Sequence, residues 1–223
     1  MMINFTDILC VIPARANSKR LPGKNTKELH GKPLVAHSIE YALNNITSNV
    51  VVTTNDKEVL KIASEHRVNV IHRPQELCSD ETSTAEVLKH AVNEVKGDYS
   101  FVVLLQPTSP LRPINLFDEA WTLLKEKKRK CLITVSANKH KLGKVEEDTF
   151  SPSTYSFGQR SQDLDPLYFE NGLLYISSID LIKNGKIIDE TPIALVVDHP
   201  YGTVDIDTEN DWEWADFLIK KYQ

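Results

Sequence analysis

Short apolar runs alternate with longer amphipathic segments along the first 136 residues, and this rhythm limits the fold more than any other feature. The apolar runs predict strands at 8–13, 49–54, 67–71, 99–105 and 131–136, and the segments between them predict helices at 33–45, 56–66, 84–96 and 116–128. Continuous apolar strands that alternate with helices are typical of a parallel sheet buried on both faces. We therefore expect an α/β fold, a mostly parallel twisted sheet flanked by helices.

Three helix starts carry the residue pattern of a capping box or its Asn-headed variant. The pairs are Asn55 with Glu58, Ser83 with Glu86, and Thr208 with Asp211. The last pair opens a predicted final helix over 208–222.

The alternation of apolar runs and amphipathic segments ends after residue 137. Segment 138–172 is polar, and it contains too many aromatic residues for a solvated linker. We interpret it as a β-rich excursion that packs against another surface, with a second subunit as one candidate, inside a single domain over 1–223. The sheet resumes at 173–182 and 193–197.

Composition excludes several classes of protein. The chain has 26 Lys and Arg and 31 Asp and Glu, which gives a net charge of −5. This balance argues against a nucleic-acid or membrane-surface binder, because such proteins usually need a basic face. No apolar run is long enough to span a membrane, and the first 15 residues lack the pattern of a signal peptide. Three widely spaced cysteines indicate buried free thiols. We expect a cytoplasmic protein.

Segment 11–25, "VIPARANSKRLPGKN", concentrates positive charge in a chain that is acidic overall. Its cations are Arg15, Lys19, Arg20 and Lys24. The segment leaves the first strand at its carboxyl end, where open parallel sheets bind ligands. Cations and backbone N–H groups that converge there suit a polyanion such as a phosphate chain. A solvated basic loop is the alternative.

The common nucleotide-binding motifs do not explain this loop. A P-loop needs Ser or Thr after Gly-Lys, but Asn25 follows Gly23-Lys24, and Ser18 stands where the first glycine belongs. A dinucleotide fingerprint needs three closely spaced glycines, and only Gly23 and Gly31 occur in the first 96 residues.

Near the other end of the chain, "VDIDTEND" places Asp205 and Asp207 two residues apart in an extended segment, and therefore on one face. Such a pair suits a Mg²⁺ ion that takes its other ligands from water and phosphates. Acidic residues at a helix N-terminus are the alternative explanation. Together with the cationic loop, the pair indicates metal-assisted phosphoryl or nucleotidyl transfer.

Four motifs, in order along nearly the whole chain, resemble the acylneuraminate cytidylyltransferase family, the CMP-sialic acid synthetases. They are "VIPARANSKRLPGKN" (11–25), "RPQELCSDETST" (73–84), "LLQPTSPLR" (104–112) and "VDIDTEND" (204–211). The resemblance implies a Rossmann-like nucleotidyltransferase that moves CMP from CTP to the anomeric hydroxyl of a nonulosonic (sialic-type) acid and releases pyrophosphate. It also implies a homodimer in which the excursion at 138–172 serves dimerisation.

The resemblance assigns roles to individual residues. Arg15 and Lys24 match triphosphate-binding cations, which with Asp207 form the catalytic set. Further nucleotide contacts, to cytosine and ribose, would come from Asn25, Arg73, Thr82 and Thr84. Turn formation, a surface charge and helix capping are the plain alternatives for these four.

The sugar-binding positions implied by the family are Gln106, Arg160 and Lys144, and the metal-binding positions are Asp205 and Asp207. A buried or turn-shaping amide is the alternative for Gln106. The match of Lys144 needs a gap in the alignment. None of the seven histidines falls in a recognised motif, so the general base is unassigned; His37 is expected to pack in the core.

Glu170, in "YFENG", departs from the Arg-Pro-type sequence of many sialic-acid members. Because this region meets the sugar, a legionaminate-type or other amino-substituted nonulosonate stands beside N-acetylneuraminate as the substrate. Two further alternatives are an enzyme for the eight-carbon acid Kdo and a catalytically inactive nucleotide-binding scaffold.

Overall fold

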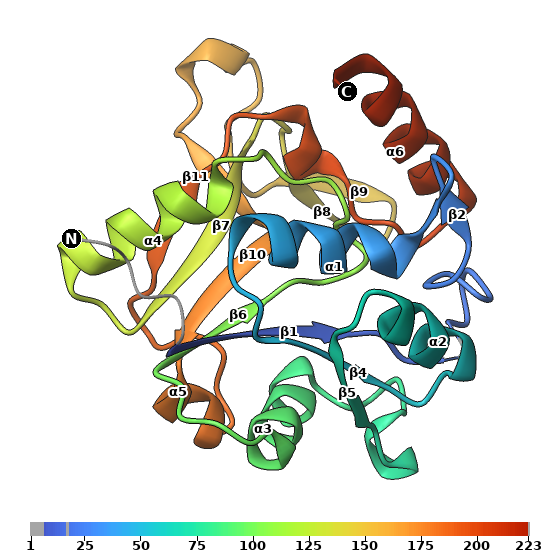
Figure 1. Cartoon of the computed structure of the whole chain (residues 1–223). Coiled ribbons are helices and arrows are strands. Elements are labelled where there is room, and N and C mark those ends of the chain that lie inside the picture. Colours follow the sequence, from blue (N-terminus) through green and yellow to red (C-terminus); the bar gives the residue numbers. More distant parts are fainter. Residues whose placement is uncertain (1–6, 17, 223) are drawn as a thin grey trace.

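The computed structural model describes residues 7–16 and 18–222, and within them seven strands form one sheet in the order β11-β7-β10-β6-β1-β4-β5 (Figure 1). The strands are β1 (Ile8–Pro13), β4 (Val50–Thr54), β5 (Asn69–His72), β6 (Phe101–Leu104), β7 (Cys131–Asn138), β10 (Leu167–Ser178) and β11 (Ile193–Val196). Only β10 runs antiparallel to its neighbours among these paired strands. The mostly parallel α/β sheet predicted from the sequence is confirmed.

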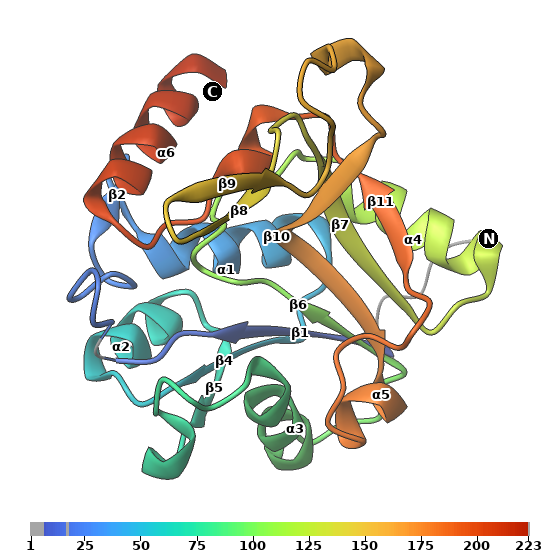
Figure 2. The same ribbon diagram turned by 180° about the vertical axis from the view of Figure 1, so that it is seen from behind.

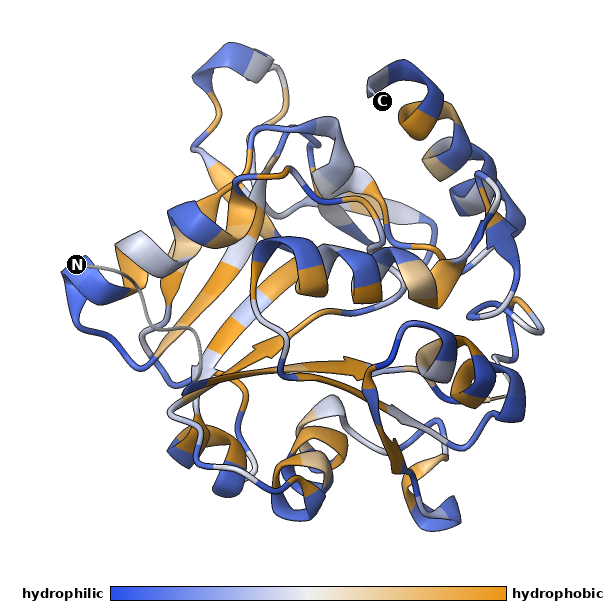
Figure 3. Ribbon diagram, viewed as in Figure 1, coloured by the Kyte–Doolittle hydropathy of each residue, from blue (hydrophilic) through white to orange (hydrophobic). Residues whose placement is uncertain are grey.

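Helices cover both faces of the sheet. On one face lie α1 (Leu34–Asn45), α2 (Lys57–Glu65) and α4 (Leu116–Lys127), and on the other lie α3 (Thr84–Glu94) and α5 (Ile179–Lys183). Successive residues of β1 alternate between the two layers: Ile8 and Cys10 pack with the first set, and Leu9 and Val11 with the second. Figure 3 shows β1 and β6 mostly orange (apolar) and the helices blue (polar) on their outer sides, which explains why these central strands read as unbroken apolar runs.

A third apolar cluster joins the two ends of the chain. The C-terminal helix α6 (Glu209–Tyr222) buries Trp212, Leu218 and Ile219 against Leu21 and Leu29, which flank the early cationic loop. The short strands β2 (Glu28–Leu29) and β3 (Lys32–Pro33) and the turn η4 (Pro200–Thr203) complete this region. The packing carries the segment before α6 to the carboxyl edge of β1 and β6.

Two of the three predicted capping boxes are confirmed. Ser83 and Glu86 make reciprocal side chain–backbone bonds at the start of α3, and Thr208 and Asp211 do the same before α6. The prediction for α2 was wrong by one residue, because Asp56 is the N-cap and accepts from the backbone N–H of Glu58.

Segment 138–172 is partly excursion and partly sheet. It contains the hairpin of β8 (Gly143–Glu146) and β9 (Thr149–Pro152), then a loop with the single turn η3 (Ser161–Asp163) that projects from the body (Figure 2). Strand β10, however, already begins at Leu167 and pairs there with Asn138. The predicted strand at 173–182 was therefore wrong at both ends, since β10 covers 167–178 and α5 follows it directly.

The cysteines are free, as expected, but only Cys10 and Cys131 are buried, whereas Cys78 is half-buried. No helix in the described ranges is long and apolar enough to cross a membrane. The sequence of the first 15 residues lacks a signal-peptide pattern, and residues 1–6 of this stretch lie outside the described residues.

Candidate active site

Three cavities lie in a row along the carboxyl edge of β5, β1 and β6. The central one, the loop cavity, has a volume of about 440 Å³ and is lined by the cationic loop, Asp80, Thr108 and Asp207. On one side the α3 cavity, about 180 Å³, shares Arg15 and Asp80 with it. On the other side the β10 cavity, about 410 Å³, shares Thr108 and Asp207 with it. The shared residues make one continuous trough with three compartments.

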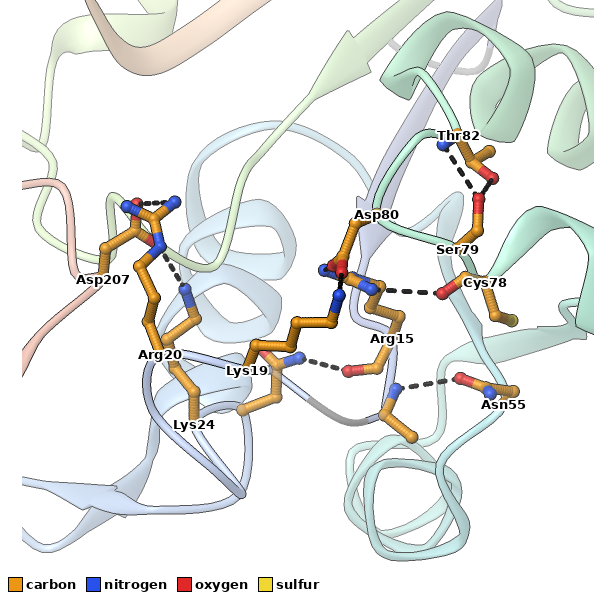
Figure 4. Close-up of polar contacts among 12 residues, drawn as sticks. Arg15, Lys19, Arg20, Lys24, Asn55, Cys78, Ser79, Asp80, Thr82 and Asp207 are labelled. Atoms are coloured by element: carbon orange, nitrogen blue, oxygen red, sulfur yellow. Dashed lines mark hydrogen bonds and ion pairs between the residues drawn. The ribbon is translucent and has the colours of Figure 1, made fainter.

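The first half of the cationic loop is tied to the segment before α3. The Arg15 guanidinium donates to the Cys78 carbonyl over 3.1 Å and forms an ion pair with Asp80, which also binds Lys19 (Figure 4). Hydrogen bonds from Lys19 and Arg15 hold the pKa of the Asp80 carboxyl below its usual range. The loop backbone is fixed as well, because Asn25 Nδ2 donates to the Arg15 carbonyl over 2.9 Å.

The second half of the loop meets the predicted metal-binding segment. Lys24 Nζ, in a side chain only 9% exposed, donates to Asp207 Oδ1 over 2.9 Å and to the Ile206 carbonyl over 2.7 Å. Arg20 binds the other oxygen of Asp207, also at 2.9 Å (Figure 4). Residues 183 positions apart in sequence thus face each other at the junction of the loop and β10 cavities.

The α3 cavity gathers three of the predicted nucleotide contacts, Arg73, Thr82 and Thr84. Arg73 follows β5, is 4% exposed, and donates to the Thr53 carbonyl over 2.9 Å, while its buried Nε has no partner in the described structure. Burial lowers the pKa of this guanidinium to about 10, so it stays cationic at neutral pH. Asn25, assigned with these residues, lies instead in the loop cavity.

The β10 cavity is lined by polar side chains, including Gln106 and Ser109, and by the carboxylates of Glu170, Asp205 and Asp207. Among its described lining residues there is no Lys, Arg or His. The Asp205 side chain opens to solvent in the cavity, but the surrounding protein desolvates it and raises its pKa; Asp207 adds to this, and a hydrogen bond from Thr108 opposes it.

Two of the predicted sugar-binding residues are not brought to this cavity within one chain. Arg160 makes an exposed two-point ion pair with Asp163, at 2.6 and 2.9 Å, beside the turn η3. Lys144 is exposed on β8. Neither is among the described residues that line the β10 cavity. Gln106 is the one predicted sugar-binding residue that does line it.

Three residues of the site were not singled out from the sequence. Asp80, in the second motif, neutralises Arg15 and Lys19, and Thr108, in the third, contacts Asp205. Arg112, also in the third motif, is buried beneath the β10 cavity. Their positions inside the motifs were the available signal, but no pattern showed which partners they meet.

Asp205 and Asp207 are the carboxylates that could hold a cation. The described residues contain no group of three or more His, Cys, Asp or Glu arranged to bind a metal. Any ion at this pair would therefore take most of its ligands from water or a substrate. His37, which the sequence placed in the core, is instead half-buried on α1 and lines none of the three compartments. Its Nε2 donates to the Leu29 carbonyl over 2.9 Å, and burial lowers the pKa of its ring.

Comparisons with known proteins identify the family. Residues 9–211 match the family described as cytidylyltransferase. The chain is 33% identical over 97% of its length to the N-acylneuraminate cytidylyltransferase of Escherichia coli O18:K1:H7, of which it spans 53%. It is 31% identical to the CMP-N,N'-diacetyllegionaminic acid synthase of Legionella pneumophila, with 97% of both chains covered. It is 29% identical to a pseudaminic acid cytidylyltransferase of Campylobacter jejuni, with 95% and 96% covered.

The fold is similar to that of a solved structure. The structure of CMP:2-keto-3-deoxy-manno-octonic acid synthetase complexed with CTP superposes with a TM-score of 0.71 at 18% identity, over 97% of this chain and 99% of that one. The match of the family over most of the chain, together with near-complete alignment to sugar-acid cytidylyltransferases, shows that this protein belongs to the cytidylyltransferase family.

Proposed function

We propose that this protein transfers CMP from CTP to the anomeric hydroxyl of a nonulosonic acid and releases pyrophosphate. The observation that carries the proposal is the meeting of Lys24 with Asp207 where the loop cavity opens into the β10 cavity. A cationic compartment and a polar compartment join at this point, as the formation of a bond between a nucleotide phosphate and a sugar hydroxyl requires.

The charge of the loop cavity supports a triphosphate as its ligand. Four cationic side chains line it, and among the described residues only the carboxylates of Asp80 and Asp207 form ion pairs with them. The positive excess suits a polyanion, and Lys24 acts most strongly because it is the least exposed of the four.

The α3 cavity suits the cytosine ring and ribose. Its small volume favours a pyrimidine over a purine. The guanidinium of Arg73, which lines this cavity, would donate to a ring acceptor of cytosine, and the hydroxyls of Thr82 and Thr84 would bind the base or ribose.

In the proposed reaction the sugar C2 hydroxyl attacks the α-phosphorus of CTP, and the bond from that phosphorus to pyrophosphate breaks. Arg15 and Lys24 neutralise the charge that gathers on the leaving pyrophosphate. Gln106 and Ser109 orient the sugar in the β10 cavity. Positioning and electrostatics then lower the barrier without a covalent intermediate.

The residues present fit a Mg²⁺ ion at Asp205 and Asp207. Asp205 lines the β10 cavity, and Asp207 lines both this cavity and the phosphate compartment; such a pair suits an ion that keeps several waters and binds phosphate oxygens. The raised pKa of Asp205 is consistent with this, since a bound cation would relieve the repulsion from Asp207. When bound, the ion supplies charge stabilisation on the phosphate oxygens.

We also propose that the protein works as a homodimer in the cytoplasm, with segment 138–172 as the dimerisation element. The exposed apolar residues of this segment and its surroundings support the proposal; they include Leu142, Val145, Phe150, Phe157, Tyr168 and Phe169. A partner's Lys or Arg would supply the cation that the β10 cavity lacks, and Lys144 and Arg160 are the candidates.

A pyrophosphate-release assay tests the proposal. CTP, UTP, ATP and GTP are each combined with N-acetylneuraminate, legionaminate-type and pseudaminate-type acids, and Kdo. We expect turnover with CTP and at least one nine-carbon acid, and a CMP-sugar product by mass spectrometry. Turnover with Kdo and with no nine-carbon acid would show that the substrate is the eight-carbon acid. Tight CTP binding without turnover on any acid would identify a scaffold.

A further inference from the structure

A buried cation without a carboxylate partner lies beneath the β10 cavity. Arg112 is 7% exposed, and none of the described carboxylates forms an ion pair with it. Burial lowers the pKa of its guanidinium to about 10, which leaves it charged at neutral pH. Because a buried charge is costly unless its donors are satisfied, the partners of this side chain indicate what it does.

The hydrogen-bond acceptors of Arg112 are neutral oxygens on three separate elements, and its guanidinium also lies 5.7 Å from the centre of the Tyr41 ring on α1. Its Nε donates to the Leu173 carbonyl over 2.6 Å, one terminal nitrogen donates to the Gln106 carbonyl over 2.9 Å, and the other donates to Ser38 Oγ over 3.1 Å. Gln106 follows β6, Leu173 belongs to β10, and Ser38 lies on α1. Gln106 lines the β10 cavity, and Leu173 directly follows Asn171 and Gly172, which line its opposite wall.

The wall at β10 is irregular where Arg112 binds it. The register between β10 and β7 shifts between Glu170 and Tyr175. The Asn171 side chain accepts from the Leu173 N–H over 3.1 Å, and a buried contact of 2.6 Å joins it to Thr134. Side chains thus replace the ladder hydrogen bonds that the bulge interrupts.

The bulge brings the β10 backbone against the Gln106 side chain. Gly172 has a φ of +71°, and a Cβ there would lie 3.1 Å from Gln106 Oε1 and 2.8 Å from Ser109 Oγ. A glycine is needed both for this backbone conformation and for the close approach. The side-chain amide of Gln106 is therefore seated against Gly172, while Arg112 holds the backbone of the same residue.

We propose that Arg112 is a positioning residue for the sugar half of the reaction: by binding the Gln106 and Leu173 carbonyls, it sets the separation of the two cavity walls and the orientation of the Gln106 amide. The identity of the ligand rests on the proposed function, but the coupling of the walls rests on these contacts alone. Arg112 itself does not line the β10 cavity, so its effect on the sugar is transmitted through Gln106 and Gly172.

Three variants separate positioning from general stability. Arg112→Met keeps the apolar stem and removes all three hydrogen bonds, and Arg112→Lys keeps the charge and a reduced set of donors. Ser38→Ala removes only the acceptor on α1, which belongs to neither β6 nor β10. We expect Arg112→Met to raise the KM for the sugar acid about tenfold or more, since small displacements of binding groups are costly, and to leave the KM for CTP within about twofold. Arg112→Lys should restore part of the loss, and Ser38→Ala should match the wild type.

Hydrogen exchange read by mass spectrometry needs no substrate and keeps the test independent of the proposed function. We expect Arg112→Met to accelerate amide exchange in peptides over 105–110 and 170–175 and to leave 11–25 unchanged, with Arg112→Lys intermediate. Should Arg112→Met fail to fold, Arg112→Lys carries both measurements alone.

Two results would overturn the inference. One is an equal rise of the KM for CTP and for the sugar acid. The other is unchanged exchange at both walls with normal kinetics per folded molecule. If the wild type turns over no nonulosonic acid, the proposed function fails, while the exchange data still decide whether Arg112 couples the walls.

Discussion

The loop cavity and the β10 cavity share a wall but are prepared to different degrees for their ligands. In the loop cavity, cations are already held in place: Lys24 is buried between Asp207 and the Ile206 carbonyl, and Arg15 is tied to the segment before α3. The described lining of the β10 cavity has three carboxylates and no basic side chain, although a sugar acid brings a carboxylate of its own. Under the proposed function, the nucleotide half is therefore assembled within one chain, and we expect the sugar half to take a cation from a second chain.

The largest expected effect is at the wall that the two cavities share. Asp207→Asn keeps the size of the side chain but removes a charge that Lys24 and Arg20 bind and that the proposed metal needs. We expect kcat for pyrophosphate release to fall by about a hundredfold or more, with an unchanged far-UV circular dichroism spectrum. Near-normal turnover would show that catalysis does not depend on the wall shared by the loop and β10 cavities, and it would contradict the assignment of Asp207 as a metal ligand.

A matched pair of lysines measures how far the nucleotide half depends on burial. Lys24→Met removes a cation 9% exposed, whereas Lys19→Met removes one 82% exposed and held only by Asp80. Since exposed ion pairs contribute little, we expect kcat/KM for CTP to fall about a hundredfold in the first variant and about threefold or less in the second. Equal losses would show that the loop acts as a diffuse positive field.

The missing cation of the sugar half is tested by Arg160→Ala. This side chain is 70% exposed in its pair with Asp163, so its removal should change the free energy of unfolding by about 1 kcal/mol or less. We expect the KM for the sugar acid to rise about tenfold, as loss of a charge-assisted hydrogen bond predicts, and the KM for CTP to stay constant. The reverse pattern would assign Arg160 to the nucleotide.

The kinetics of Arg160→Ala should be measured together with the molar mass of the variant in solution, which shows whether it is a dimer. A rise in the sugar KM together with an intact dimer would locate the residue in the partner's β10 cavity. The same rise in a strictly monomeric protein would require the loop at η3 to fold over its own cavity.

The smallest expected effect is a gain in stability from Asp205→Asn. Desolvation raises the pKa of this carboxyl in the folded chain, so its contribution to stability decreases as pH rises from the unfolded pKa through the folded one. Without ligand and at neutral pH, the variant should therefore melt at a slightly higher temperature than the wild type, and the difference should vanish at acidic pH. A lower Tm of Asp205→Asn at neutral pH would contradict desolvation as the cause of the raised pKa of Asp205.

Much of the fold was predictable because local signals and burial agree. The buried strands are almost purely apolar, and β1, α1 and α4 lie within one residue of their predicted bounds. The error at β10 has a physical cause: its first half extends past the end of β6 and is exposed, and Glu170, Asn171 and Gly172 interrupt the apolar run, so the pattern reads as loop.

The sequence alone determined which chemistry the site can hold, because Arg15, Lys24, Asp205 and Asp207 stand in motifs whose residue types suit a metal-bound triphosphate. Only the tertiary structure decided which of them meet, since the packing of α6 against Leu21 and Leu29 carries Asp207 to Lys24. It also separated Asn25 from Arg73, left Arg160 at the surface, and gave Arg112 a place between two cavity walls. Long-range packing sets these distances, and no local pattern encodes them.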